Sequence, residues 1–185
     1  MGMALRVSSL LPGEEVQFVK KANAVVRVTE AGLKRFSHDQ LMWTIGMHGS
    51  EAIGGQLHVT NYRLVFCSHF FNRATGRFSI FLPVISGVRD TSWGIRRQIE
   101  ISTGIHQFTF VVWGVPALVA AIEGLRRHWS PDQVTWLAET ATADYATLGE
   151  GLVPRRNQAL SPNMSPLTCV GATGLMELQE LSRPA

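Results

Sequence analysis

The chain has 185 residues, of which 45% are hydrophobic, 17% charged and 9% aromatic, a composition typical of one folded domain with surplus length rather than of a disordered chain. Its two cysteines, Cys67 and Cys169, lie far apart without metal-ligand spacing, so neither a disulfide framework nor a zinc site is predicted. The uncharged stretch 107–122 is shorter than the roughly 20 residues of a membrane span. We therefore expect a cytoplasmic protein whose contact with a membrane is peripheral.

The positive charge is concentrated in the middle of the chain. Residues 55–100 carry six basic and two acidic side chains, whereas residues 130–185 carry three basic and six acidic ones. The basic excess favours an anionic partner such as a lipid headgroup surface, although a solvated face would carry the same charges. Nucleic-acid binding is not predicted, because the excess is small and no helix-turn-helix, zinc-finger or RNP pattern is present.

The predicted strands begin early in the chain. Residues 15–28 follow a Leu-Pro-Gly turn and are strand-like, whereas residues 29–54 lose any period and predict a long loop. Between residues 55 and 112 apolar and polar side chains alternate, which predicts β-strands. Residues 55–60 and 63–67 form a predicted hairpin around Asn61 and Tyr62. Further strands are predicted at residues 77–82, 98–102 and 107–112.

The alternation gives way to a helical pattern at Pro116. Apolar residues recur on one face of a predicted helix over residues 116–129, with proline in a favourable first position. This helix and the strands permit one shared apolar core. The predicted members of that core are Leu57, Val59, Leu64, Phe66, Phe78, Ile80, Ile99, Ile101, Phe108, Phe110, Leu118, Ile122 and Leu125.

A second helix is predicted immediately after the first. Ser130 and Gln133 have the spacing of a capping box, with Pro131 between them, and a helical apolar face follows to about residue 148. Residues 149–185 are rich in Pro, Gly and Ser and lack a period, which predicts a flexible tail.

Two stretches of the sequence resemble a known family. Residues 11–16 (LPGEEV) and 55–66 (GQLHVTNYRLVF) are similar to the opening and the central hairpin of GRAM domains, which also head myotubularin-type lipid phosphatases. The later strands and the helix at 116–129 match the family in order, so the resemblance covers residues 10–129 and leaves out the extension helix (130–148) and the tail (149–185). It implies a mainly β, pleckstrin-homology-like (PH-like) fold: a seven-stranded bent barrel capped by a C-terminal α-helix, used for lipid or protein docking.

Basic residues near the predicted loops form the candidate lipid site. Each would contribute about 1 kcal/mol near an anionic surface, although the same residues would also keep a hydrophobic barrel soluble. Phe70 and Phe71 lie beside this group and would either insert at a membrane interface or close the barrel end. The candidate lipid-binding residues are Lys20, Lys21, Lys34, Arg35, Arg73, Arg77, Arg96 and Arg97.

Enzymatic chemistry is not predicted. Cys67 and Arg73 have the Cys-x5-Arg spacing of cysteine phosphatases, but the intervening SHFFN has no glycine to form a tight phosphate loop. Six scattered histidines show no metal-binding pattern, so no metal or cofactor is expected.

We expect a non-catalytic, membrane-associated adaptor that binds phosphoinositide or another anionic lipid. The alternative is a protein-docking module that binds its partner through the helix at 131–148.

Overall fold

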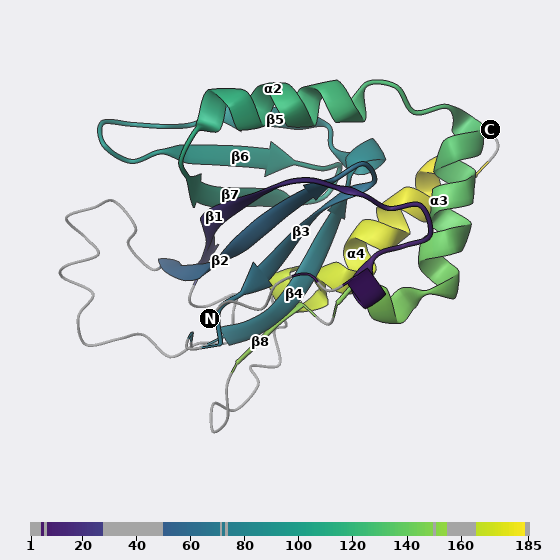
Figure 1. Ribbon diagram of the computed structural model, residues 1–185, viewed down its shortest axis with the longest axis horizontal. Helices are drawn as coiled ribbons and strands as arrows, with labels where there is room; N and C mark the ends of the chain where they lie inside the picture. The colour runs from purple at the N-terminus through teal and green to yellow at the C-terminus, as the bar shows by residue number, and fades with distance from the viewer. Residues whose placement is uncertain are drawn as a thin grey trace.

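One curled antiparallel sheet forms the body of the protein (Figure 1). The computed structural model describes residues 5, 7–27, 50–70, 72, 74–149, 151–154 and 166–183. In this part of the chain the strands are ordered β5-β6-β7-β1-β2-β3-β4-β8. Their bounds are β1 Val16–Arg27, β2 Ser50–Thr60, β3 Arg63–Ser68, β4 Ala74–Phe81, β5 Gly87–Asp90, β6 Gln98–Ser102, β7 Gln107–Val112 and β8 Gly151–Pro154.

The curl of the sheet depends on the long strand β1. It pairs with β2 along nearly its whole length and with β7 through Ala22–Val25, so one strand belongs to both halves of the sheet.

The predicted mainly β architecture with a closing helix is confirmed. The described sheet has eight strands rather than the predicted seven, because β8 comes from the segment expected to be a tail and pairs with β4. Strand β2 also begins earlier than predicted, at Ser50.

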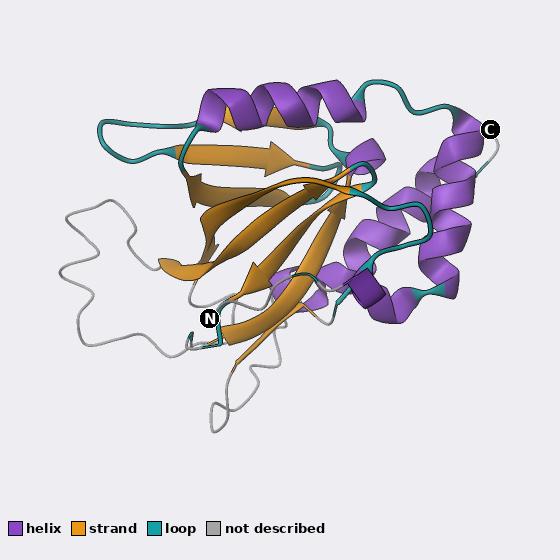
Figure 2. Cartoon of the chain, viewed as in Figure 1, coloured by secondary structure: helices purple, strands orange, loops and turns teal. Residues whose placement is uncertain are grey.

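Within the residues that the structure describes, three α-helices follow or cover the sheet (Figure 2). Helix α2 (Val115–Arg126) packs against β5 and β6, as predicted for the closing helix. The capping box of α3 (Pro131–Ala143) is confirmed, since the Gln133 N–H donates to Ser130 Oγ at 3.2 Å and the Ser130 N–H to Gln133 Oε1 at 2.9 Å. This helix ends earlier than predicted, and a 3-10 turn, η3 (Tyr145–Thr147), continues the chain.

The predicted core is confirmed. All its proposed members from the strands and two from α2, Leu118 and Ile122, are buried together in one cluster, with Leu125 packed partly buried against it. The strand side chains enter this cluster on alternate positions, as period-two patterning requires. Phe66, Phe78 and Phe110 contact one another in its centre, with ring centroids 5.4 to 6.2 Å apart.

A second core lies on the other side of β3 and β4 and was not predicted. It brings Phe81 and Val84 together with the apolar face of α3 and with Leu175 and Leu178 of helix α4 (Pro166–Leu181). Strand β3 is consequently buried on both faces. The expectation of a loose tail is wrong for residues 151–154 and 166–181, which form β8 and α4; the rest of that segment, except residues 149, 182 and 183, lies outside the described residues.

Candidate functional site

The turn between β5 and β6 presents large apolar side chains to solvent. The Trp93 N–H donates to the Arg96 carbonyl and the Arg96 N–H to the Trp93 carbonyl, both at 3.0 Å, which closes a tight turn. Gly94 in the middle of this turn has a φ of 56°, a conformation that favours glycine. With the backbone turned in this way, Trp93 is 85% and Ile95 96% exposed.

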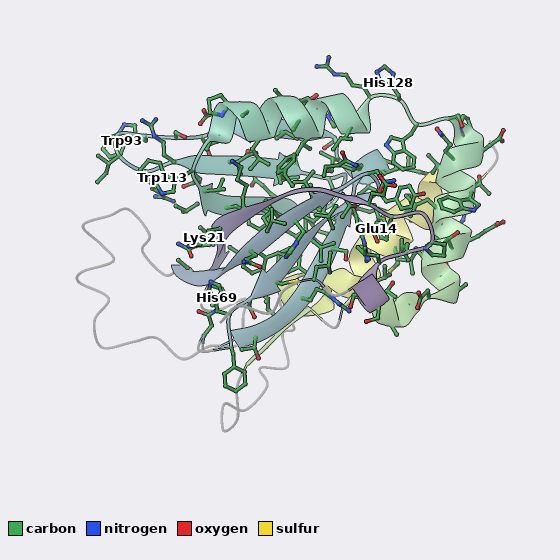
Figure 3. The ribbon with its side chains drawn as sticks, viewed as in Figure 1. Glu14, Lys21, His69, Trp93, Trp113 and His128 are labelled. Atoms are coloured by element: carbon green, nitrogen blue, oxygen red, sulfur yellow. The ribbon has the colours of Figure 1, made fainter. Side chains whose placement is uncertain are left out.

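A second exposed tryptophan lies beside this turn. Trp113, which follows β7, is 76% exposed. Val112 pairs with Ala22, and its N–H donates to the Arg97 carbonyl at 3.0 Å. Continuing this register by one residue brings Trp113 next to Lys21 and Arg96. Figure 3 shows Lys21, Trp93 and Trp113 at the same end of the molecule.

Positive charge surrounds these apolar side chains. Lys21 and Arg97 are exposed, whereas Lys20 and Arg96 are half-buried. The Lys20 side chain extends to the turn between β7 and α2. A Cβ atom placed on Gly114 in that turn would lie 3.5 Å from Lys20 Nζ. We call this surface the tryptophan rim. It consists of Lys20, Lys21, Trp93, Ile95, Arg96, Arg97 and Trp113.

One carboxylate, Asp90, stabilises the turn of the tryptophan rim. Its Oδ1 accepts a hydrogen bond from the Ser92 N–H at 2.9 Å. Hydrogen bonds from the side chain and backbone of Ser92, together with the charge of Arg97, lower the pKa of Asp90, so it is ionised at neutral pH. Counted over the described residues, the tryptophan rim carries more cationic side chains than carboxylates.

The tryptophan rim contains half of the residues predicted from sequence to bind lipid: Lys20, Lys21, Arg96 and Arg97. Lys34, Arg35 and Arg73 lie outside the described residues.

Arg77 is placed differently from the sequence prediction. It lies within β4, not in a turn, paired with Cys67 on one side and Gly151 on the other. Its guanidinium is half-buried, and its Nη2 donates to the Ala146 carbonyl at 3.3 Å. Burial lowers the pKa of Arg77. Arg77 therefore lies beside η3 and not in the tryptophan rim.

Sequence reasoning missed the apolar residues of the tryptophan rim. Phe70, one of the two phenylalanines considered for membrane insertion, is exposed in the β3–β4 turn, and Phe71 lies outside the described residues. A usable signal was nevertheless present: Trp93 and Ile95 flank a glycine in a segment too short and too turn-like to be a strand. Large apolar side chains at a turn have no core to fill, which indicates a contact surface.

The described residues give no support to phosphatase chemistry. Cys67 lies in β3 and is buried, and burial raises the pKa of its thiol from about 9 to about 11. The reactive thiolate is therefore scarce at neutral pH. Among the described residues, no group of three or more His, Cys, Asp or Glu side chains could hold a metal ion. No described helix is both long and apolar enough to cross a bilayer.

Comparisons with known proteins find several solved structures that are similar to this chain. No protein-family model and no curated protein matches the chain. The C-terminal domain of an unknown protein from Leishmania infantum is 16% identical, with a TM-score of 0.43, over 63% of this chain and 88% of that one. The Vps36 N-terminal PH domain is 11% identical, with a TM-score of 0.40, over 64% and 86% of the two chains. With such values, neither assigns this chain to a family.

Proposed function

We propose that this protein is a non-catalytic module that binds phosphoinositide or another anionic lipid of a membrane surface through the tryptophan rim. The observation that carries the proposal is the exposure of Trp93, Ile95 and Trp113 among cationic side chains. Tryptophan is favoured at the membrane interface because its ring is apolar and its N–H is polar. Lysine and arginine beside it attract anionic headgroups.

The two kinds of side chain have separate tasks in this binding. The cations draw the protein to an anionic surface over about a Debye length, roughly 10 Å at 0.1 M salt. The apolar side chains then leave water, and each contributes on the order of 1–3 kcal/mol when it is fully buried. Because the Asp90 carboxylate is held by Ser92, it stabilises the turn that presents Trp93 and Ile95.

Co-sedimentation of the full chain with vesicles tests this proposal. We expect binding to phosphatidylcholine vesicles only when phosphatidylserine or a phosphoinositide is included, and weaker binding as salt is raised. Comparison of these two anionic lipids at equal surface charge separates phosphoinositide recognition from general attraction. The Trp93→Ala/Ile95→Ala variant is expected to bind at least about tenfold more weakly, because it loses two inserting side chains.

The matched control is Ile105→Ala, which removes an equally apolar, exposed side chain from the turn between β6 and β7. Its binding should equal that of the unaltered chain. An Arg96→Gln/Arg97→Gln variant should lose affinity mainly at low salt. Absence of binding to every anionic vesicle at low salt, or unchanged binding by both rim variants, would overturn the proposal.

A further inference from the structure

A groove lined by aromatic side chains lies at the other end of α2 from the tryptophan rim. It has a volume of about 450 Å³ and forms where the β2–β3 turn meets the connection between α2 and α3. Helix α2 begins beside Trp113 and ends before His128, and its 12 residues separate the two surfaces by about 18 Å. Figure 3 shows Trp113 and His128 at opposite ends of this helix. We call this surface the aromatic groove. Its lining residues are Asn61, Tyr62, Leu125, His128, Trp129, Gln133 and Trp136.

The three rings of the aromatic groove hold one another in fixed positions. Tyr62 lies edge-to-face with Trp129, with centroids 6.2 Å apart, and with Trp136 at 5.4 Å. The Trp129 indole N–H donates to the Leu125 carbonyl at 3.1 Å, which fixes its orientation. Trp136 remains 43% exposed although its ring contacts Tyr62. A ligand would therefore meet a preformed aromatic surface and would not have to order it.

Acidic residues flank the aromatic groove. Asp132, Trp136 and Glu139 are all exposed on α3 and follow one another at i, i+4 and i+7, so they lie along one face of the helix. The sequence of α3 contains no Lys or Arg. On the side of the groove formed by the β2–β3 turn, exposed Glu15 lies next to the lining residue Asn61. The Glu15 backbone N–H donates to Asn61 Oδ1 at 2.8 Å.

The pKa of the Tyr62 phenol reflects its burial and the carboxylates of Glu14 and Glu15. Its pKa is raised, first by burial and then by the charge of Glu14, with a smaller effect of Glu15. Glu14 is neutralised by its ion pair with Arg63 in the interior, so Glu15 supplies the exposed charge on this side. His128 also lines the groove, and the neighbouring Arg127 is paired with Glu123 at 3.6 Å.

We propose that the aromatic groove binds a basic peptide segment of a partner protein, with an arginine or lysine side chain of that segment stacked on Trp136. A cation over an indole face is attracted by the ring, and Glu15, Asp132 and Glu139 complement the charge of the peptide. The same carboxylates repel an anionic headgroup, so this surface and the tryptophan rim favour opposite ligands. The inference does not depend on the lipid proposal, because the two surfaces share no residue.

Selection from a library of random peptides displayed against the full chain tests this inference. We expect the enriched peptides to carry Arg or Lys, and a synthetic copy of the best one to bind in a fluorescence anisotropy titration. Replacing its central arginine by citrulline, which keeps the shape but removes the charge, should weaken binding about tenfold. Trp136→Ala and the charge-neutral Asp132→Asn/Glu139→Gln variant should each weaken binding by a similar factor.

Tyr145→Ala is the matched control, since Tyr145 is also an exposed aromatic residue after α3 but lies outside both surfaces. Its peptide affinity should be unchanged, and thermal melting should show that all variants are folded. Enrichment of neutral or acidic peptides, or of none, would overturn the inference. So would self-association of the full chain that Trp136→Ala abolishes, because the occupant would then be a second copy of this chain.

Discussion

Arg63 is the residue that ties the two cores and the N-terminal segment together. Its Nε and Nη2 each donate to a carboxylate oxygen of Glu14 at 2.9 Å, and Nη2 also donates to the Ser9 carbonyl at 2.8 Å. Nη1 reaches Ser79 Oγ on β4 at 3.0 Å and the Thr147 carbonyl at 3.3 Å. Both charged side chains are fully buried, and such a pair is tolerated only when its hydrogen bonds are satisfied.

Removing one partner of this pair should destabilise the fold strongly. We expect Glu14→Gln or Arg63→Met to lower the free energy of unfolding by about 3–5 kcal/mol, because each leaves a buried group without its counter-charge. The double variant should cost clearly less than the sum of the two. Arg89→Gln, which breaks an exposed pair with Glu100, is the control and should cost at most about 1 kcal/mol. Additive effects in urea denaturation would show that the pair is not coupled.

At the scale of residues, the sequence predicted the interior far better than the surface. Core positions such as Phe66 and Phe110 can be recognised in the sequence because apolar side chains recur there with the period of a strand. Half of the predicted lipid-binding residues lie in the tryptophan rim: Arg96 and Arg97 come from a turn, as expected, whereas Lys20 and Lys21 lie within β1 rather than near a loop. The buried pair of Glu14 and Arg63 could not be foreseen, because charged residues almost never occupy full burial unless the fold pairs them.

Helix α4 shows why an element can be missed in a glycine-containing segment. Glycine costs about 1 kcal/mol relative to alanine inside a helix, so its presence argues against one. Gly174 nevertheless allows α4 to pack closely on β4: a Cβ atom there would lie 3.3 Å from the Ser79 carbonyl oxygen and 3.6 Å from Phe81, so a larger residue would require a small shift. The close approach of α4 to β4 therefore compensates for the poor local propensity.

Strand β8 was missed for the same reason, because a glycine next to it permits close packing of the backbone. Gly149 precedes it with a φ of 94°, and a Cβ atom there would lie 2.3 Å from the Arg77 carbonyl oxygen. Glycines that look like a flexible tail in the sequence in fact allow two backbones to cross. By contrast, the hairpin of β2 and β3 and the capping box at Ser130 could be predicted, because their signals are local in sequence.

Helix α4 should contribute measurably to stability. Leu178 is fully buried in the second core, whereas Leu181, one turn later, is 55% exposed. We expect Leu178→Ala to lower the free energy of unfolding by about 2–5 kcal/mol, because it leaves a cavity. Leu181→Ala should change it by no more than about 0.5 kcal/mol. Equal effects of the two variants in chemical denaturation would mean that α4 is not docked as the structure has it.

At the scale of the whole molecule, helix α2 separates two surfaces of opposite charge. The basic excess of residues 55–100 contributes Arg96 and Arg97 to the tryptophan rim, while the acidic excess of residues 130–185 contributes Asp132 and Glu139 to the flank of the aromatic groove. The charge asymmetry along the sequence therefore places opposite charges at opposite ends of the folded molecule. The proposed functions use this polarity: one end of the molecule faces an anionic membrane and the other a basic partner.

Quenching of tryptophan fluorescence by brominated lipids tests the membrane contact most directly, because bromine atoms in the acyl chains quench only indole rings that reach them. We expect anionic vesicles of brominated lipid to quench the full chain, and a Trp129→Phe/Trp136→Phe variant to be quenched as well, since those rings lie in the aromatic groove. The Trp93→Phe/Trp113→Phe variant should lose most of the quenching. Quenching that persists in this variant, or none in the unaltered chain bound to vesicles, would contradict the account.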